Sequence, residues 1–139
     1  MSIRKDVVLS ELDNHDDSGD DETVKVTTLD DYLRAGEVDC PKIDFIKMDV
    51  EGVEFSVLRG ARSILTENQD ILVFFECTWQ GCELSGHKIS EVFIYLRELG
   101  FGLYGWRPES KTWDENEDYL SIVGNIWACR DKKTLPRLS

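Results

Sequence analysis

The sequence predicts a single α/β domain with a mainly parallel sheet whose last strand is antiparallel. The chain has 139 residues, enough for one hydrophobic core and too few for two. Short apolar segments alternate with segments whose apolar residues recur at helical spacing, which is typical of right-handed βαβ crossovers. The last two predicted strands have no helix between them, so they can pair only as an antiparallel hairpin.

The first predicted elements are a strand at residues 24–28 and a short helix at residues 29–33. The strand is predicted because V-K-V-T-T alternates and is rich in β-branched residues. Thr28 is a suitable N-cap, and the two aspartates that follow Leu29 suit the positive end of the helix. Gly36 is expected to end this helix.

A strand at residues 43–50 and a helix from Val53 form the predicted centre of the domain. The segment I-D-F-I-K-M-D-V is short and mostly apolar, which predicts a strand buried on both faces. Apolar residues then recur at helical spacing up to residue 65. Gly60 within this helix costs about 1 kcal/mol relative to Ala. We attribute that glycine to close contact between the helix and the sheet.

The rest of the chain contains two clear apolar strands, one amphipathic helix and polar connections. The helix is predicted because apolar side chains recur on one face and Gly100 follows them. In chain order, we expect a strand at 71–76, a polar loop to residue 87, a helix at 89–99, a strand at 101–106, a polar loop at 108–118, a strand at 122–129 and a polar tail at 130–139.

The composition excludes several classes of partner. Lys and Arg number 16 and Asp and Glu number 28, so the formal charge is −12. Nucleic-acid phosphates and anionic lipid headgroups require a basic surface, so neither nucleic acid nor membrane is an expected partner. No apolar run approaches the roughly 20 residues of a membrane helix, and the N-terminus lacks the apolar core of a signal peptide. We therefore expect a cytoplasmic location.

The acidic residues are concentrated near the N-terminus, where residues 11–22 contain seven acids in twelve positions. Such a block predicts a flexible, solvated segment, so residues 1–23 are expected to lie outside the packed domain. A cation site is the alternative, but the acids and the glycine are out of register with an EF-hand loop. A halophilic surface would also account for the charge.

The four cysteines do not form a recognisable framework. Their positions are 40, 77, 82 and 129, which gives neither a disulfide pattern nor a paired C-x-x-C zinc site. We expect reduced thiols and no metal site.

Acidic side chains end two of the predicted buried strands. In open α/β sheets, ligands bind beyond the carboxyl ends of the strands. Asp49 and Glu51 follow the first of these strands, and Glu76 ends the second. Lys47 lies two residues before Asp49 and therefore on the same face. These residues form the predicted site, together with Trp79 just after Glu76.

Structural roles remain open for the same residues. Asp49 or Glu51 can cap the helix that begins near Val53, and Lys47 can serve only as the partner of a neighbouring acid. Glu76 can be a surface acid at the end of a strand. The four tryptophans (Trp79, Trp106, Trp113 and Trp127) can be packing residues. Neither His15 nor His87 has the spacing of a nucleophile–His–acid triad.

Two segments resemble the signature elements of a known family. V-T-T-L-D-D-Y-L at residues 26–33 and K-M-D-V-E-G-V-E-F-S-V-L-R-G-A at residues 47–61 are similar to those of the FkbM family of S-adenosylmethionine-dependent methyltransferases. The resemblance covers about residues 24–129. It implies a Rossmann-like methyltransferase sheet with an antiparallel last strand, and methyl transfer to a hydroxyl of a sugar or small metabolite. It also implies S-adenosyl-L-methionine as the cofactor.

In that family picture, Asp49 and Glu51 face the donor and the acceptor. Asp49 is then the candidate base or metal ligand, with Lys47 and Glu51 beside it, while Glu76 and Trp79 orient the acceptor. The chain departs from the family pattern because no Gly-rich turn follows a predicted strand. It therefore resembles the C-terminal half of the family domain, and we expect a partial sheet.

A partial sheet leaves one strand edge without its neighbours, so we expect self-association through that edge. The expected ligand is a small-molecule acceptor. The alternative function is a non-catalytic α/β interaction module, or a half-domain that a partner completes in trans.

Overall fold

The computed structural model describes residues 26–36, 42–115 and 124–138. The acidic segment at residues 1–23 lies outside these ranges, and so does the prediction that it is flexible. Cys40 also lies outside them. Within the described ranges, no helix is long and apolar enough to cross a membrane.

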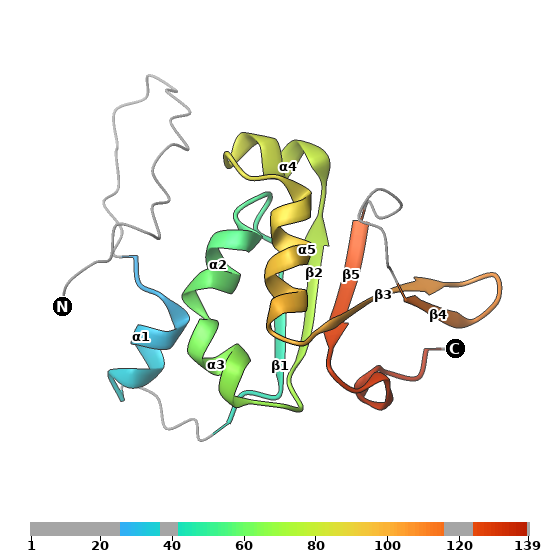
Figure 1. Ribbon diagram of the computed structural model, residues 1–139, viewed down its shortest axis with the longest axis horizontal. Helices are drawn as coiled ribbons and strands as arrows, with labels where there is room; N and C mark the ends of the chain where they lie inside the picture. The colour runs from blue at the N-terminus through green and yellow to red at the C-terminus, as the bar shows by residue number, and fades with distance from the viewer. Residues whose placement is uncertain (1–25, 37–41, 116–123, 139) are drawn as a thin grey trace, which may run out of the picture.

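A five-stranded sheet carries α2, α3 and α5 on one face (Figure 1). The elements in chain order are α1 (Leu29–Arg34), β1 (Phe45–Met48), α2 (Glu54–Gly60), α3 (Arg62–Glu67), β2 (Leu72–Cys77), α4 (Trp79–Leu84), α5 (Ile89–Glu98), β3 (Gly102–Arg107), β4 (Thr112–Glu115), β5 (Gly124–Cys129) and a 3-10 turn, η2 (Lys132–Thr134).

The sheet has the strand order β1-β2-β5-β3-β4. β1 and β2 are parallel, whereas the β2–β5, β5–β3 and β3–β4 pairs are antiparallel. The prediction of a mainly parallel sheet is therefore wrong for the described residues. The physical reason is the place of β5: it lies between β2 and β3, which run in the same direction, and so makes both contacts antiparallel. The predicted antiparallel pairing of the last strand is confirmed.

Two elements occur where the sequence predicts loops. α4 begins at Trp79 because the Thr78 hydroxyl accepts a hydrogen bond from the Gly81 amide at 3.1 Å, as an N-cap does. β4 forms because Trp113 pairs with Trp106 across the β3–β4 hairpin. Both elements are short, at six and four residues, and neither has a long periodic pattern.

The first two predicted strands also differ from the structure. Residues 26–28 are not a strand, and residues 24 and 25 lie outside the described ranges. Thr28 is the predicted N-cap of α1, with its hydroxyl 3.0 Å from the Asp31 amide. β1 is the edge strand of the described sheet and is not buried on both faces: Met48 is buried toward the helices, whereas Phe45, on the other face, remains 49% exposed.

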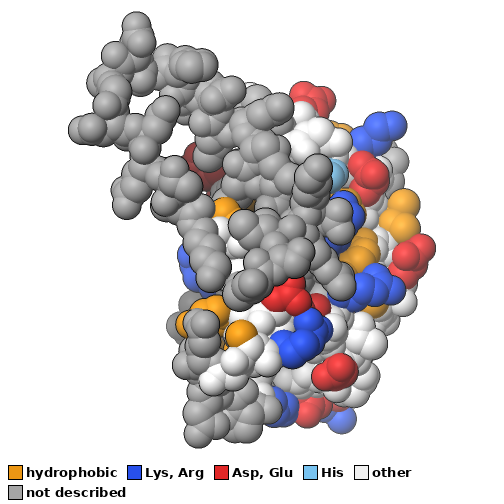
Figure 2. All heavy atoms as spheres, turned by 90° about the vertical axis from the view of Figure 1, so that its left-hand side faces the viewer, with side chains coloured by type: hydrophobic (Ala, Val, Ile, Leu, Met, Phe, Trp, Pro, Cys, Tyr) orange, Lys and Arg blue, Asp and Glu red, His pale blue; other side chains and the backbone are white. Residues whose placement is uncertain are grey.

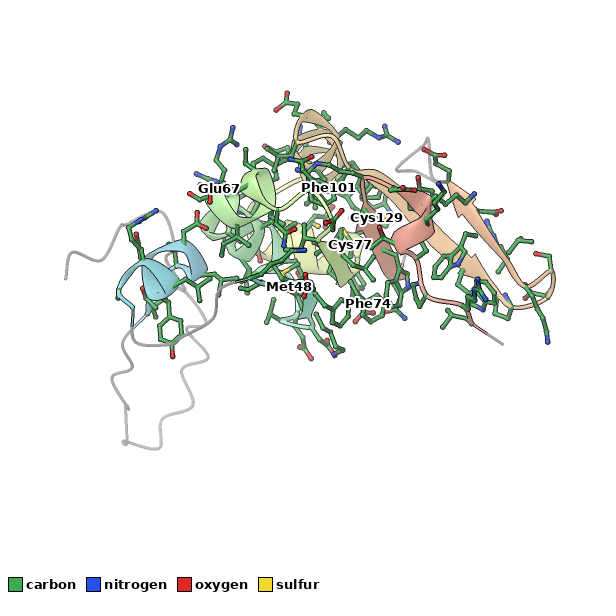
Figure 3. The ribbon with its side chains drawn as sticks, turned by 90° about the horizontal axis from the view of Figure 1, so that it is seen from below. Met48, Glu67, Phe74, Cys77, Phe101 and Cys129 are labelled. Atoms are coloured by element: carbon green, nitrogen blue, oxygen red, sulfur yellow. The ribbon has the colours of Figure 1, made fainter. Side chains whose placement is uncertain are left out.

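The main core lies between the sheet and the helices. In β2, Val73, Phe75 and Cys77 are fully buried toward the helices, while Leu72 and Phe74 belong to the opposite face. Figure 3 shows Phe74 and Phe101 on opposite sides of the sheet. The helix predicted at residues 89–99 is confirmed as α5, with Leu99 as its C-cap, and it buries four apolar residues: Ile89, Val92, Phe93 and Leu96. Burial of such side chains stabilises the fold by about 2 kcal/mol each.

A second cluster covers part of the helix-free face. It consists of Tyr104, Cys129 and Leu135, with Leu72, Trp113 and Trp127 packed against them. The Trp113 indole donates a hydrogen bond to the Pro136 carbonyl at 3.2 Å, which holds the last described residues against the hairpin. The segment after β5, expected to be a polar tail, is thus packed against the domain up to Pro136.

The two segments that carry the family resemblance contact each other. The Asp30 carboxylate accepts hydrogen bonds from the Ser63 and Ile64 amides at 2.8 and 3.2 Å, and so caps the first turn of α3. A Cβ added to Gly60 would lie 3.2 Å from the Thr28 Cβ. Gly60 therefore allows close approach to the start of α1, and the predicted contact with the sheet is not the reason for it.

Arg130 holds the other end of α3. Its guanidinium donates to the carbonyls of Leu65 at 2.6 Å and Asn68 at 3.0 Å, and also to Leu99, just after α5, at 2.8 Å. It lies over the Phe101 ring, with Cζ 4.2 Å from the centroid. Burial lowers the pKa of the Arg130 guanidinium. One side chain thus satisfies carbonyl groups at the ends of two helices.

Acidic and basic side chains are interspersed on the side of the molecule that carries α1 (Figure 2). The Arg34–Asp31 pair, at 2.6 Å, is one example of such neighbours. The described part of this side is therefore not a continuous acidic surface.

We predict that Arg130→Gln lowers the free energy of unfolding by about 3 kcal/mol, because hydrogen bonds to a charged donor contribute about 1.5–3 kcal/mol and several carbonyls lose their partner. Urea denaturation followed by circular dichroism measures the change. The matched control is Arg137→Gln, which removes an exposed guanidinium with no such contacts in the described residues. Equal stability of the two variants would contradict the assignment.

Candidate functional site

The predicted site residues lie at the carboxyl ends of β1 and β2. Met48 and Phe75 are the last residues that pair between these two parallel strands, so Asp49, just after β1, and Glu76, the second-last residue of β2, follow them at the same edge of the sheet. The Lys47 ammonium lies 3.6 Å from the Asp49 carboxylate, and the two side chains are 56% and 60% exposed. An exposed pair of this kind contributes less than about 1 kcal/mol to stability. The pair is open to a ligand.

The turn between β1 and α2 is held by an acid that the site prediction did not include. Glu54 is 6% exposed, and its carboxylate oxygens accept hydrogen bonds from the amides of Val50 at 3.2 Å and Gly52 at 2.8 Å. The sequence signal was the second glutamate of V-E-G-x-E, directly before an apolar helix. Such an acid can bind back to the amides of the turn that precedes it.

The contacts of Glu54 show that neither Asp49 nor Glu51 caps the N-terminus of α2. Val53 is the N-cap residue of α2 and makes no side-chain capping bond, and the amides of the turn bind Glu54. Among the described contacts, neither Asp49 nor Glu51 binds a helix amide. Glu51 is exposed and has a positive φ of 50°, in the left-handed region. Both carboxylates lie at the surface of the turn.

A close contact between two glycines places α4 against this turn. Gly52 has a φ of 107°, and a Cβ added to Gly81 would lie 2.9 Å from the Gly52 Cα. A side chain at either position would collide with the backbone of the other, so both positions require glycine. The contact puts α4, whose first residue is Trp79, next to the turn. The Trp79 side chain is 39% exposed.

Two buried thiols, one at the end of β2 and one in α4, lie close to each other. The sulfur atoms of Cys77 and Cys82 are 3.7 Å apart, and both side chains are buried. Burial raises the pKa of the Cys77 thiol, and the nearby Cys82 and Glu54 raise it further. Burial also raises the pKa of the Cys82 thiol. Both are therefore protonated at neutral pH and are poor nucleophiles. Cys129 is also a buried free cysteine.

The backbone of the turn between β1 and α2 has no free space or free amide for a ligand at Val50 and Gly52. The amides of Val50 and Gly52 are engaged by Glu54, and Gly81 fills the space beside Gly52. This turn therefore offers no backbone cradle to a donor. Across the described part of the chain, no three His, Cys, Asp or Glu side chains lie close enough together to hold a metal ion.

A scan against protein-family models matches residues 3–103 to the Methyltransferase FkbM domain. The matched range contains both signature segments and every predicted site residue. It begins within the acidic N-terminal segment and ends in β3, so its bounds differ from those of the resemblance. Neither a curated protein nor a solved structure matches the chain.

We predict that Glu54→Gln lowers the free energy of unfolding by about 2 kcal/mol, because its amide group leaves one buried turn N–H without an acceptor. Amide hydrogen exchange at Val50 and Gly52 should accelerate in the same variant. Glu51→Gln is the control, since that side chain is exposed in the same turn. Unchanged exchange at both amides would show that Glu54 does not hold the turn.

Proposed function

Because the chain belongs to the FkbM methyltransferase domain family, we propose that it forms the C-terminal half of an S-adenosylmethionine-dependent O-methyltransferase. Its acceptor would be a hydroxyl group of a sugar or another small metabolite. The observation that supports this proposal is the position of Asp49 and Glu76 at adjacent strand ends, beside a turn that Glu54 holds. Ligands of α/β sheets bind at such strand ends.

Asp49 is the proposed base. Methylation of a hydroxyl oxygen requires that the hydroxyl be oriented and that its proton be removed. The Asp49 carboxylate is 60% exposed, so an acceptor hydroxyl can reach it. The Lys47 ammonium lies 3.6 Å away, so the ion pair can orient the Asp49 carboxylate. We assign Lys47 this positioning role.

Glu51, Glu76 and Trp79 are the proposed orienting residues. Carboxylates accept hydrogen bonds from the hydroxyls of a sugar, and two carboxylates on neighbouring segments can bind adjacent hydroxyls. The exposed face of Trp79 offers an apolar surface for a sugar ring. This combination suits a polyhydroxylated acceptor better than an apolar one.

A half-domain completed by another polypeptide is the second candidate. It is favoured by the lack of a donor cradle in the described turn and by the position of β1 at the edge of the described sheet. In that case the chain associates through β1, either with itself or with a partner that binds the donor. Phe45, which is 49% exposed on that strand, would lie in the contact.

We expect no saturable heat when S-adenosylmethionine is titrated into the 139-residue chain by calorimetry, because the described turn cannot cradle the donor. Size-exclusion chromatography with light scattering on the same sample tests for self-association. A stoichiometric binding isotherm from a monomer would show that this chain alone forms the donor site, which would overturn the half-domain proposal.

In the complete enzyme, we predict that Asp49→Asn lowers turnover by about 10² or more, the usual effect of losing an acid–base group. Its free energy of unfolding should change by less than about 1 kcal/mol, because the Lys47–Asp49 pair is exposed. Transfer of a labelled methyl group measures turnover. Glu98→Gln, an exposed change on α5, serves as the control. Normal turnover with reduced stability would make Asp49 a structural residue.

A further inference from the structure

A pocket of about 430 Å³ lies where the last described residues fold back against the β3–β4 hairpin. Two aromatic and four cationic side chains are among its lining residues: Trp106, Trp113, Lys111, Lys132, Lys133 and Arg137. It is separate in the fold from the Asp49 turn, and nothing in the proposed function uses it. The pocket is large enough for a small ligand, since such sites measure roughly 300–1,000 Å³.

The charge of this pocket is opposite to that of the whole chain. The chain has a formal charge of −12, yet among the described residues no Asp or Glu lines the pocket. The nearby Asp114 carboxylate binds Arg107 at 2.6 Å, and strand alternation places it on the face opposite Trp113. Asp131 accepts a hydrogen bond from the Lys133 amide at 2.9 Å and so caps η2. The lining cations make no ion pair among the described residues.

Trp106 and Trp113 form an aromatic wall of the pocket, and neighbouring residues hold this wall in place. The Trp106 and Trp113 rings lie 5.0 Å apart at an interplanar angle of 59°. Trp113 also contacts the Trp127 ring at 5.6 Å and donates to the Pro136 carbonyl. The Lys132 ammonium lies 3.5 Å from the Trp113 carbonyl oxygen and 5.6 Å from the Tyr104 ring. A ligand therefore meets a wall whose orientation is already fixed.

We propose that this pocket binds a mononucleotide, in which a planar base is joined to a phosphate. The base stacks on the Trp106 indole, and Lys133 and Arg137 bind the phosphate. Stacking on tryptophan and charge-assisted hydrogen bonds to phosphate are the interactions that these residue types provide. Lys111 and Lys132 add positive charge at the rim.

The overall acidity is compatible with this small ligand but not with a long polyanion. At physiological ionic strength, charges are screened over about 8 Å, so a mononucleotide responds mainly to the local cations. An extended nucleic acid would also be repelled by the rest of a chain whose net charge is −12. The pocket therefore selects a free nucleotide over a nucleic-acid strand.

Calorimetry of the 139-residue chain with AMP, adenosine and inorganic phosphate tests this proposal. We expect saturable AMP binding, with adenosine and phosphate each at least tenfold weaker because each lacks one half of the ligand. Trp106→Leu and the double variant Lys133→Gln/Arg137→Gln should each weaken AMP binding at least tenfold. The matched control, Arg34→Gln/Arg59→Gln, removes two positive charges from α1 and α2 and should leave binding unchanged.

Circular dichroism confirms that each variant is folded before binding is compared. If Trp106→Leu does not fold, the exposed double variant alone decides the outcome. The proposal is overturned by an absence of saturable AMP binding in the millimolar range, or by equal loss of affinity in the control. Phosphate that binds as tightly as AMP, or a single-stranded oligonucleotide that binds more tightly, also overturns it.

Discussion

The described fold depends on the way that α3 is held at its two ends. An isolated helix of six residues is unstable in water because nucleation is costly. Here, an acid from the first signature segment caps the N-terminus, and an arginine after the last strand binds the C-terminal carbonyls. Each charge has the sign that complements its end of the helix dipole. Asp30 and Arg130 thus tie the beginning and the end of the described chain to one short central helix.

A second constraint determines where the candidate site can form. The buried Glu54 carboxylate and the contact between Gly52 and Gly81 together define the turn after β1. Because Glu54 accepts the hydrogen bonds of the turn amides, Asp49 and Glu51 do not cap the helix, and both remain at the surface. The same arrangement leaves the Val50 and Gly52 amides engaged and Gly81 packed against Gly52. One turn therefore explains both why the carboxylates are accessible and why its own backbone offers no cradle to a ligand.

The sequence was sufficient to predict elements that depend on neighbouring residues, and insufficient to predict features that depend on contacts between distant residues. The periodic pattern of α5, the apolar run of β2 and the Thr28 cap depend on neighbouring residues, and each was predicted. The capping of α3 by Asp30 joins residues 33 and 34 positions apart, and one Arg130 bond spans 65 positions. No local pattern encodes such pairs. β5 was predicted as a strand, but its place between β2 and β3 depends on tertiary packing, so the share of parallel pairs was overestimated.

The two faces of the sheet have different roles, and this difference links the two proposals. The helix-covered face contains the buried core, whereas the other face carries a row of half-buried or exposed aromatic rings. Phe45 lies 6.2 Å from Trp127, which lies 5.6 Å from Trp113, which lies 5.0 Å from Trp106. Lys47 shares a face with Phe45 because residues two apart on a strand point the same way. The row therefore runs from the strand that leads to Asp49 to the wall of the cationic pocket. A substitution at Trp127, in the middle of this row, would disturb both ends through packing alone.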